Sequence, residues 1–399
     1  MSYLRSIPTR RLLVLCATIV VAGIGATAIA LAATGGGATP PPKPLAEAIH
    51  DALSAGPVEG VTARIEFTNH LVDAASLQGG DPLLTGATGR LWATGDRLRL
   101  ELQAAPDGGG GDVQILVDGD RVTVIDAAAR TVYRVTLPAQ DHAGRDHAAG
   151  TPDVPALSRI QDLLARVAQR ATLSGAQPSN VAGRPAYTVR ISPRHDGGLL
   201  GAVEAAWDAA RGVPLRAAVY ATTGKDPVLE LKATDIAFGP VAAADLTVPE
   251  PAGAKVVDLS PPAGGGASQD KGARPVTGLD AVRARVRFDV AAPATLVGLP
   301  RQEVRLVAVG DTAGVLVSYG RGLGGMVVLE APAAAAQRGA TGSRDGLLSN
   351  LPKISVNGAS GQELDTALGT VIRFQRGGVA YTLLGSVPPA AAEAAARGL

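Results

Sequence analysis

Hydrophobic and polar residues alternate along much of the chain with a period of two. Over residues 61–67, Val, Ala, Ile and Phe alternate with Thr, Arg and Glu, which is the pattern of a strand with one buried face. Turn pairs such as Gly95-Asp96 separate further runs of this kind and predict a meander of antiparallel strands. Those strands are expected at residues 89–94, 97–102, 113–117, 122–125 and 131–136.

Two segments have the helical period instead. Residues 45–54 predict one short helix, and residues 154–169 predict a longer one. The apolar face of the longer helix consists of Leu157, Ile160, Leu163, Leu164 and Val167. A second set of strands follows at residues 186–192, 202–207, 215–221 and 228–238, before an extended segment at 246–259.

Residues 261–275 contain almost no apolar side chains and predict a disordered linker between two domains. The smaller unit beyond it, 276–399, combines strands with a final Ala-rich helix that Pro388-Pro389 starts and Gly398 stops. Its strands are expected at residues 284–290, 303–309, 314–319, 326–330, 370–375 and 379–384.

The N-terminal residues have the pattern of an export signal. Arg5, Arg10 and Arg11 precede the uncharged stretch 12–33, which is long enough either for a cleaved signal peptide or for a retained membrane anchor. Both interpretations place the rest of the chain outside the cytoplasm, secreted or tethered to the outer face of the cytoplasmic membrane by residues 12–33. The Gly- and Pro-rich segment 34–44 is expected to be a linker.

Charge and composition exclude several functions. With 37 Lys+Arg against 36 Asp+Glu, the net charge of +1 gives no general attraction to nucleic acid. A single cysteine, Cys16, excludes a disulfide framework, an iron–sulfur cluster and a thiolate zinc site.

Motifs that carry chemistry are weak or missing. Residues 320–325 match GxGxxG, but a strand sequence follows them, so a glycine-rich hairpin loop is expected instead of a cofactor site. Asp141-His142 and Asp146-His147 lack the spacing of a metal site, and a solvated loop is favoured there. The chain has no hydrolase, kinase or metalloprotease motif, so we expect a protein that is not an enzyme and needs no cofactor.

The two runs of strands, with a helix between them, predict a curved sheet covered by helices. Such a sheet either packs solid or encloses an apolar cavity, and both remain open, although close packing is the commoner outcome. Alternation places one set of residues on the inner face, as candidates to line a cavity: Val61, Ala63, Ile65, Phe67, Leu98, Leu100, Leu102, Val113, Ile115 and Val117.

Residues 86–125 contain a strand, the sequence GDRLRL and a hairpin around Asp118-Gly119-Asp120. Residues 203–216, VEAAWDAARGVPLR, form a second hairpin pattern, and residues 249–259 a closing segment. Together these motifs resemble the LolA superfamily of periplasmic lipoprotein and lipid carriers over about residues 45–260. Residues 298–300, 317–320 and 381–385 resemble the small second domain of YdcC-type envelope proteins of Gram-positive bacteria.

The resemblance implies a mainly β, α+β protein: an incomplete, curved antiparallel β-barrel with a helical lid, plus a small α+β C-terminal domain. It also implies a cavity that receives acyl chains. Arg99 falls where such carriers have an arginine able to hydrogen-bond the lid, although alternation alone equally predicts a surface arginine there.

The function that follows is an exported, non-enzymatic carrier that binds the acyl chain of a lipid or lipoprotein in the cell envelope. The alternative is an RseB-like sensor that binds a membrane anti-sigma factor or another protein partner. We expect a monomer that has no nucleic-acid partner.

Overall fold

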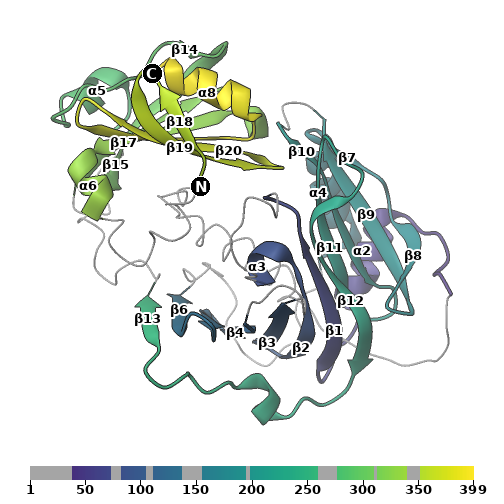
Figure 1. Ribbon diagram of the computed structural model, residues 1–399. Coiled ribbons are helices and arrows are strands. Elements are labelled where there is room, and N and C mark those ends of the chain that lie inside the picture. Colours follow the sequence, from purple (N-terminus) through teal and green to yellow (C-terminus); the bar gives the residue numbers. More distant parts are fainter. Residues whose placement is uncertain are drawn as a thin grey trace.

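The computed structural model describes residues 38–72, 82–104, 111–136, 155–194, 198–258, 276–309, 312–338 and 351–399. In these parts of the chain, the strands β1 to β21 all belong to two sheets, one in the N-terminal domain and one in the C-terminal domain (Figure 1). The first 37 residues, with the expected export signal, lie outside the described residues. The same is true of Asp141, His142, Asp146 and His147.

The larger sheet is a curled, open half-barrel, as the sequence predicts (Figure 1). Its strand order is β13-β6-β5-β4-β3-β2-β1-β12-β11-β10-β9-β7, and β8 also pairs with β9. All neighbours are antiparallel except β13 and β6. The strands of the first half are β1 (Val61–Asn69), β2 (Ala87–Thr94), β3 (Arg97–Ala104), β4 (Val113–Asp118), β5 (Arg121–Asp126) and β6 (Thr131–Thr136). Those of the second half are β7 (Ala171–Leu173), β8 (Gln177–Val181), β9 (Arg184–Pro193), β10 (Leu200–Asp208), β11 (Pro214–Ala221), β12 (Pro227–Phe238) and β13 (Lys255–Asp258).

The core of the half-barrel consists of rows of apolar side chains that cross the sheet from strand to strand. Because side chains alternate between the faces of each strand, residues in register on neighbouring strands share a face. One such row on the concave face runs through Ile236, Ala63, Leu91, Leu100, Ile115 and Val124. These residues belong to one hydrophobic cluster.

Short helices lie against this sheet. Helix α2 (Leu45–Ser54) buries Ala48 against Tyr187 and Trp207, and by register Trp207 shares a face with Ala205 and Ala217. Helix α4 (Leu157–Ala168) contacts α2 and β7, and α3 (Pro82–Thr85) contacts β1 and β3. The apolar face of α4 is only partly covered. Of its residues only Ile160 is buried, whereas the side chain of Leu163 is 53% exposed.

The C-terminal domain contains the second sheet, with the strand order β14-β15-β16-β17-β21-β20-β19-β18. Its strands are β14 (Thr295–Leu296), β15 (Leu299–Val309), β16 (Thr312–Tyr319), β17 (Met326–Pro332), β18 (Lys353–Val356), β19 (Ala359–Thr366), β20 (Gly369–Arg376) and β21 (Val379–Gly385). Its helices are α5 (Leu279–Arg283), α6 (Ala333–Arg338) and α8 (Pro389–Arg397). Helix α8 packs Ala392, Ala395 and Ala396 into the core of this sheet, where small side chains allow a close approach.

The strand predicted at residues 284–290 is wrong. This segment follows α5 without pairing to any described strand, yet Val286, Phe288 and Val290 still pack on the core while the residues between them are exposed. A segment that packs on a core without pairing in a sheet can therefore show the same alternation of apolar and polar residues as a strand. Strands β18 and β19 and helix α5 were not predicted. The glycine-rich residues 320–325 form the expected hairpin loop, with η4 (Gly322–Gly324) between β16 and β17.

A carboxyl group is buried in the middle of the C-terminal core. Glu330 on β17 is fully buried, and its Oε2 accepts a hydrogen bond of 3.0 Å from the backbone N–H of Ala291. Its Oε1 has no hydrogen-bond partner within the described residues. Burial raises the pKa of Glu330 to about 7, although the Ala291 bond opposes this rise.

This buried carboxyl makes the stability of the protein depend on pH. The folded chain holds the Glu330 proton more tightly than the unfolded chain, so stability falls as the pH rises from about 4.5 to about 7. At pH 8 we expect the free energy of unfolding of Glu330→Gln, measured in urea, to exceed that of the wild type by up to about 3 kcal/mol. Near pH 5 the two proteins should have the same free energy of unfolding. Glu303→Gln, at an exposed position on β15, is the control and should leave the pH dependence unchanged. Equal pH dependence in Glu330→Gln and the wild type would contradict this assignment.

Candidate functional site

The concave face of the half-barrel contains an apolar cavity of about 120 Å³. Strands β1, β2, β11 and β12 supply most of its wall, and most of the lining side chains are aliphatic. The lining residues are Val58, Val61, Ala63, Ile65, Leu91, Ala93, Thr94, Gly95, Val213, Pro214, Leu215, Arg216, Ala217, Leu231, Ala233 and Ile236.

Small side chains create this space. Ala63 and Ala93 on one side of the cavity, and Ala217 and Ala233 on the other, stand at inward positions that larger residues would fill. A β-bulge on β12 also contributes, because Ala63 pairs with Ile236 while Ile65 pairs with Ala233. The extra residue lets both Ala233 and Ile236 face the cavity, although they lie three positions apart on the strand.

The size and lining of the cavity determine what it can hold. An apolar protein cavity of about 150 Å³ stays dry and binds benzene, so this one has room for roughly six carbon atoms. It can take the end of an acyl chain, but a whole lipid with its headgroup does not fit inside. The aliphatic wall offers such a chain burial and little hydrogen bonding.

The residues that alternation places on the inner face occupy two parts of this surface. Val61, Ala63 and Ile65 line the cavity. The others belong to the same hydrophobic cluster without lining the cavity: Leu98, Leu100, Leu102, Val113 and Ile115 are buried, and Phe67 and Val117 are partly buried. The lining residues on β11 and β12 were missed, because the pairing of β1 with β12 joins distant parts of the chain that alternation cannot connect.

Arg99 lies on β3 between Leu98 and Leu100 and points to the opposite, outer face. Its guanidinium donates to Gln114 Oε1 at 3.0 Å, to Glu101 Oε2 at 2.9 Å and to the backbone oxygen of Asp245 at 3.2 Å. It also stacks over the ring of Trp92, 4.7 Å from the centroid. Asp245 belongs to η3 (Ala243–Leu246), so Arg99 holds the segment that returns from β12 towards β13. A role for Arg99 in holding a lid stays a prediction.

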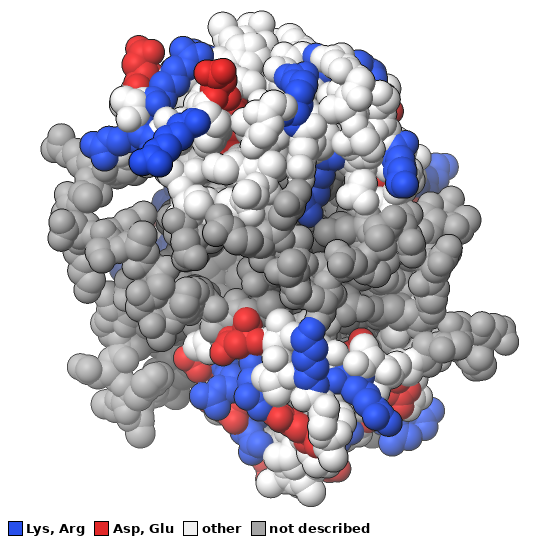
Figure 2. Space-filling model, turned by 60° about the vertical axis from the view of Figure 1, so that its left-hand side comes forward, with Lys and Arg blue, Asp and Glu red and all other residues white. Residues whose placement is uncertain are grey.

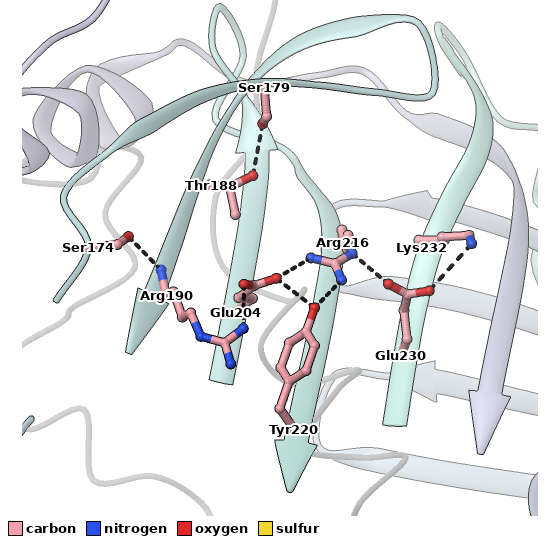
Figure 3. A network of polar contacts seen from close by, with 9 residues as sticks. All are labelled: Ser174, Ser179, Thr188, Arg190, Glu204, Arg216, Tyr220, Glu230 and Lys232. Carbon is pink, nitrogen blue, oxygen red and sulfur yellow. Dashed lines mark hydrogen bonds and ion pairs between the residues drawn. The ribbon is translucent and has the colours of Figure 1, made fainter. Parts of the chain in front are cut away.

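Strands β9 to β12 carry a network of charged side chains on the face opposite the cavity (Figure 3). At its centre the Arg216 guanidinium donates to Glu204 at 2.6 Å, to Glu230 at 2.6 Å and to the Tyr220 hydroxyl at 2.7 Å. Glu204 also accepts from Arg190 at 2.8 Å and from Tyr220 at 2.8 Å. Burial alone would raise the pKa of Glu204, but the hydrogen bonds from Arg216, Arg190 and Tyr220 together lower it.

The network extends to β1 and covers small residues. Lys232 lies 3.4 Å from Glu230 and 3.2 Å from Glu66 on β1, so charges of alternating sign cross neighbouring strands. Beneath the long side chains, Ala202 and Ala218 are fully or almost fully buried beside Tyr220. This network fixes the strands behind the cavity wall, to which Arg216 itself contributes.

The surface charges have no single sign on the face shown in Figure 2, where basic and acidic side chains both occur on the C-terminal domain above and on the half-barrel below. Within the described residues, no three His, Cys, Asp or Glu side chains are grouped closely enough to hold a metal ion. None of the helices in this part of the chain is both long and apolar enough to span a membrane.

The network should contribute strongly to stability. Replacing Arg216 by Met would remove a positive charge that pairs with both Glu204 and Glu230, two largely buried carboxylates. We therefore expect a loss of about 2–4 kcal/mol in the free energy of unfolding, measured in urea. Arg134→Met removes an exposed ion pair with Glu250 and should cost less than about 1 kcal/mol. Equal losses in the two variants would contradict a special role for Arg216.

No protein-family model and no curated protein matches this chain. Among solved structures, it is similar to MucB in complex with MucA(peri), at 16% identity and a TM-score of 0.42, over 88% of this chain and 97% of that one. The MucA/MucB complex of Pseudomonas aeruginosa matches at 16% identity and a TM-score of 0.41, over 88% and 96%. A LolA superfamily protein, NE2245 from Nitrosomonas europaea, matches at 10% identity and a TM-score of 0.22, over 52% and 99%.

Similarities with TM-scores this low carry no argument about this chain. The half-barrel architecture is seen directly in the strand order and the curl of the larger sheet, with helices against it. The resemblance of residues 276–399 to YdcC-type domains stays a prediction.

Proposed function

We propose that this chain is an exported, non-enzymatic protein of the cell envelope that binds the acyl chain of a lipid or lipoprotein. The observation that carries this proposal is the aliphatic cavity on the concave face of the half-barrel. The apolar stretch 12–33 supports export, and if it is retained it keeps the domain close to a source of acyl chains.

The free energy of burying methylenes indicates how much of the acyl chain the protein must bind. About six methylenes in the cavity contribute roughly 5 kcal/mol, at about 0.8 kcal/mol each. Micromolar affinity needs about 8 kcal/mol, or roughly ten methylenes, even before the cost of association is counted. The cavity therefore anchors one end of the acyl chain, and the remainder lies along the neighbouring concave surface. That surface includes Val203, an apolar side chain that is 38% exposed.

A second candidate function is a regulatory envelope protein that binds a membrane protein, such as an anti-sigma factor. The small volume of the cavity favours it, as does the contact of the C-terminal domain with the end of the half-barrel. Cross-linking in intact cells discriminates between the two functions. A specific membrane protein cross-linked to the chain supports the regulator, and its absence together with bound lipid supports the carrier.

The acyl-chain proposal is tested by filling the cavity. Ala63→Leu/Ala233→Leu adds six carbon atoms to the lining and should weaken palmitate binding at least about tenfold, because those atoms occupy the space of the chain end. The exported protein, purified without detergent, is measured by native mass spectrometry and by palmitate titration. Lipid that co-purifies with the wild type should be lost from this variant.

Ala237→Leu/Ala244→Leu is the matched control. It adds the same six carbon atoms at exposed positions outside the cavity lining and should bind palmitate like the wild type. If the wild type carries no extractable lipid and gains no mass with palmitate, the carrier proposal is wrong and the regulatory function becomes the better one.

A further inference from the structure

A hairpin turn of the C-terminal domain packs against the half-barrel. The turn joins β19 to β20, and its residues Ala367 and Leu368 join a hydrophobic cluster with Leu71, Val228 and Leu229. The backbone N–H of Ala367 donates to the carbonyl oxygen of Leu71 at 2.8 Å. One apolar cluster therefore contains residues of both domains.

Ser386 lies next to this turn and forms hydrogen bonds between the two domains. The backbone N–H of Leu199, just before β10, donates to the Ser386 carbonyl at 3.2 Å and to its Oγ at 3.0 Å. The Ser386 Oγ in turn donates to the carbonyl of Leu368 at 2.7 Å. This serine thus links the turn to the start of β10 in the half-barrel.

The apolar cluster that the turn joins extends to the concave face, next to the cavity. Leu229 belongs to this cluster, and Leu231, two residues further along β12, lines the cavity. Residues two apart on a strand point to the same face and lie about 7 Å from each other. Phe67 and Val219, which also pack in this cluster, are in register with Leu231 and Leu229.

We propose that the turn at residues 366–369 is a plug that competes with the acyl chain for this apolar patch. The inference rests on the proposed function, in which the cavity holds only the chain end and the rest must run over the neighbouring concave surface. The plug covers part of that surface. Binding of an acyl chain then displaces the turn and releases the C-terminal domain from the half-barrel.

The contact is of a size that a ligand can replace. It consists of two apolar residues of the turn, Ala367 and Leu368, and of hydrogen bonds donated by the backbone N–H groups of Ala367 and Leu199, which water can also satisfy once the domains part. Domain contacts this limited normally permit relative motion. Only molecules with the plug open can bind the whole acyl chain. The apparent affinity for the acyl chain is therefore the affinity of the open form multiplied by the fraction of molecules that are open.

Gly198→Ala tests the plug with minimal chemical change. A Cβ at Gly198 would lie 2.4 Å from the Ser386 carbonyl oxygen and 2.7 Å from its Cβ, so an alanine pushes the domains apart. Gly253→Ala is the matched control. Gly253 has a similar φ, +69° against +60°, but nothing lies within 4 Å of its added Cβ, so both variants bear the same backbone strain.

We expect Gly198→Ala to bind palmitate at least about threefold more tightly than the wild type and Gly253→Ala to bind it equally. Hydrogen exchange at the Ala367 amide, followed in the exported wild-type protein, should accelerate when palmitate is added. Leu368→Asp, which places a carboxylate in the contact, is a second route to the open form. Leu384→Asp, at an exposed leucine of the same domain, is its control.

The outcomes separate this inference from the function on which it rests. If palmitate binds the wild type, but neither opening variant binds it more tightly and exchange at Ala367 is unchanged, the plug is wrong and the carrier function stands. If palmitate binds none of these proteins, both proposals fail.

Discussion

The structure depends on one constraint: a wide antiparallel sheet with a single apolar face must cover that face. The rows that cross β12, β1, β2, β3, β4 and β5 place aliphatic side chains in register over a curved surface. Curling brings part of this surface against itself, helix α2 covers another part, and the C-terminal domain contacts its open end. The cavity lies where the side chains are too small to meet, so it is a direct consequence of alanine at inward positions.

The two faces of the second-half strands divide the work of stability and binding. On the outer face, Arg216 and its carboxylate partners tie β10, β11 and β12 with short charge-assisted hydrogen bonds. Such bonds demand fixed geometry, and they hold the strand that supplies Ala217 and Leu215 to the cavity. The inner face uses only non-directional apolar contacts, which a flexible chain can replace without leaving an unpaired polar group. The same strands therefore have an outer face held by directional hydrogen bonds and an inner face held by apolar contacts alone.

The sequence predicted what depends on local pattern and missed what depends on long-range pairing. Alternation identified the strands around Val61, Leu98 and Val113, and their inward residues belong to the core. It failed at residues 284–290, where a chain lying across the sheet has the same period as a strand. The lining residues on β12 could not be predicted from the sequence for two physical reasons. The strand pairs with β1, which is distant along the chain, and its bulge interrupts the alternation of inward and outward side chains between Ala233 and Ile236.

If the half-barrel binds acyl chains as proposed, the contact between its domains would join the carrier and sensor functions. A cavity that holds only the end of an acyl chain would leave the rest to bind at the apolar cluster that includes Leu229 and the turn of the C-terminal domain. Occupancy of the cavity and docking of the second domain are then linked, and each must weaken the other by the same factor. A carrier built in this way reports its own loading through the position of its C-terminal domain. A partner that recognises the released domain would read the presence of lipid without contacting the lipid.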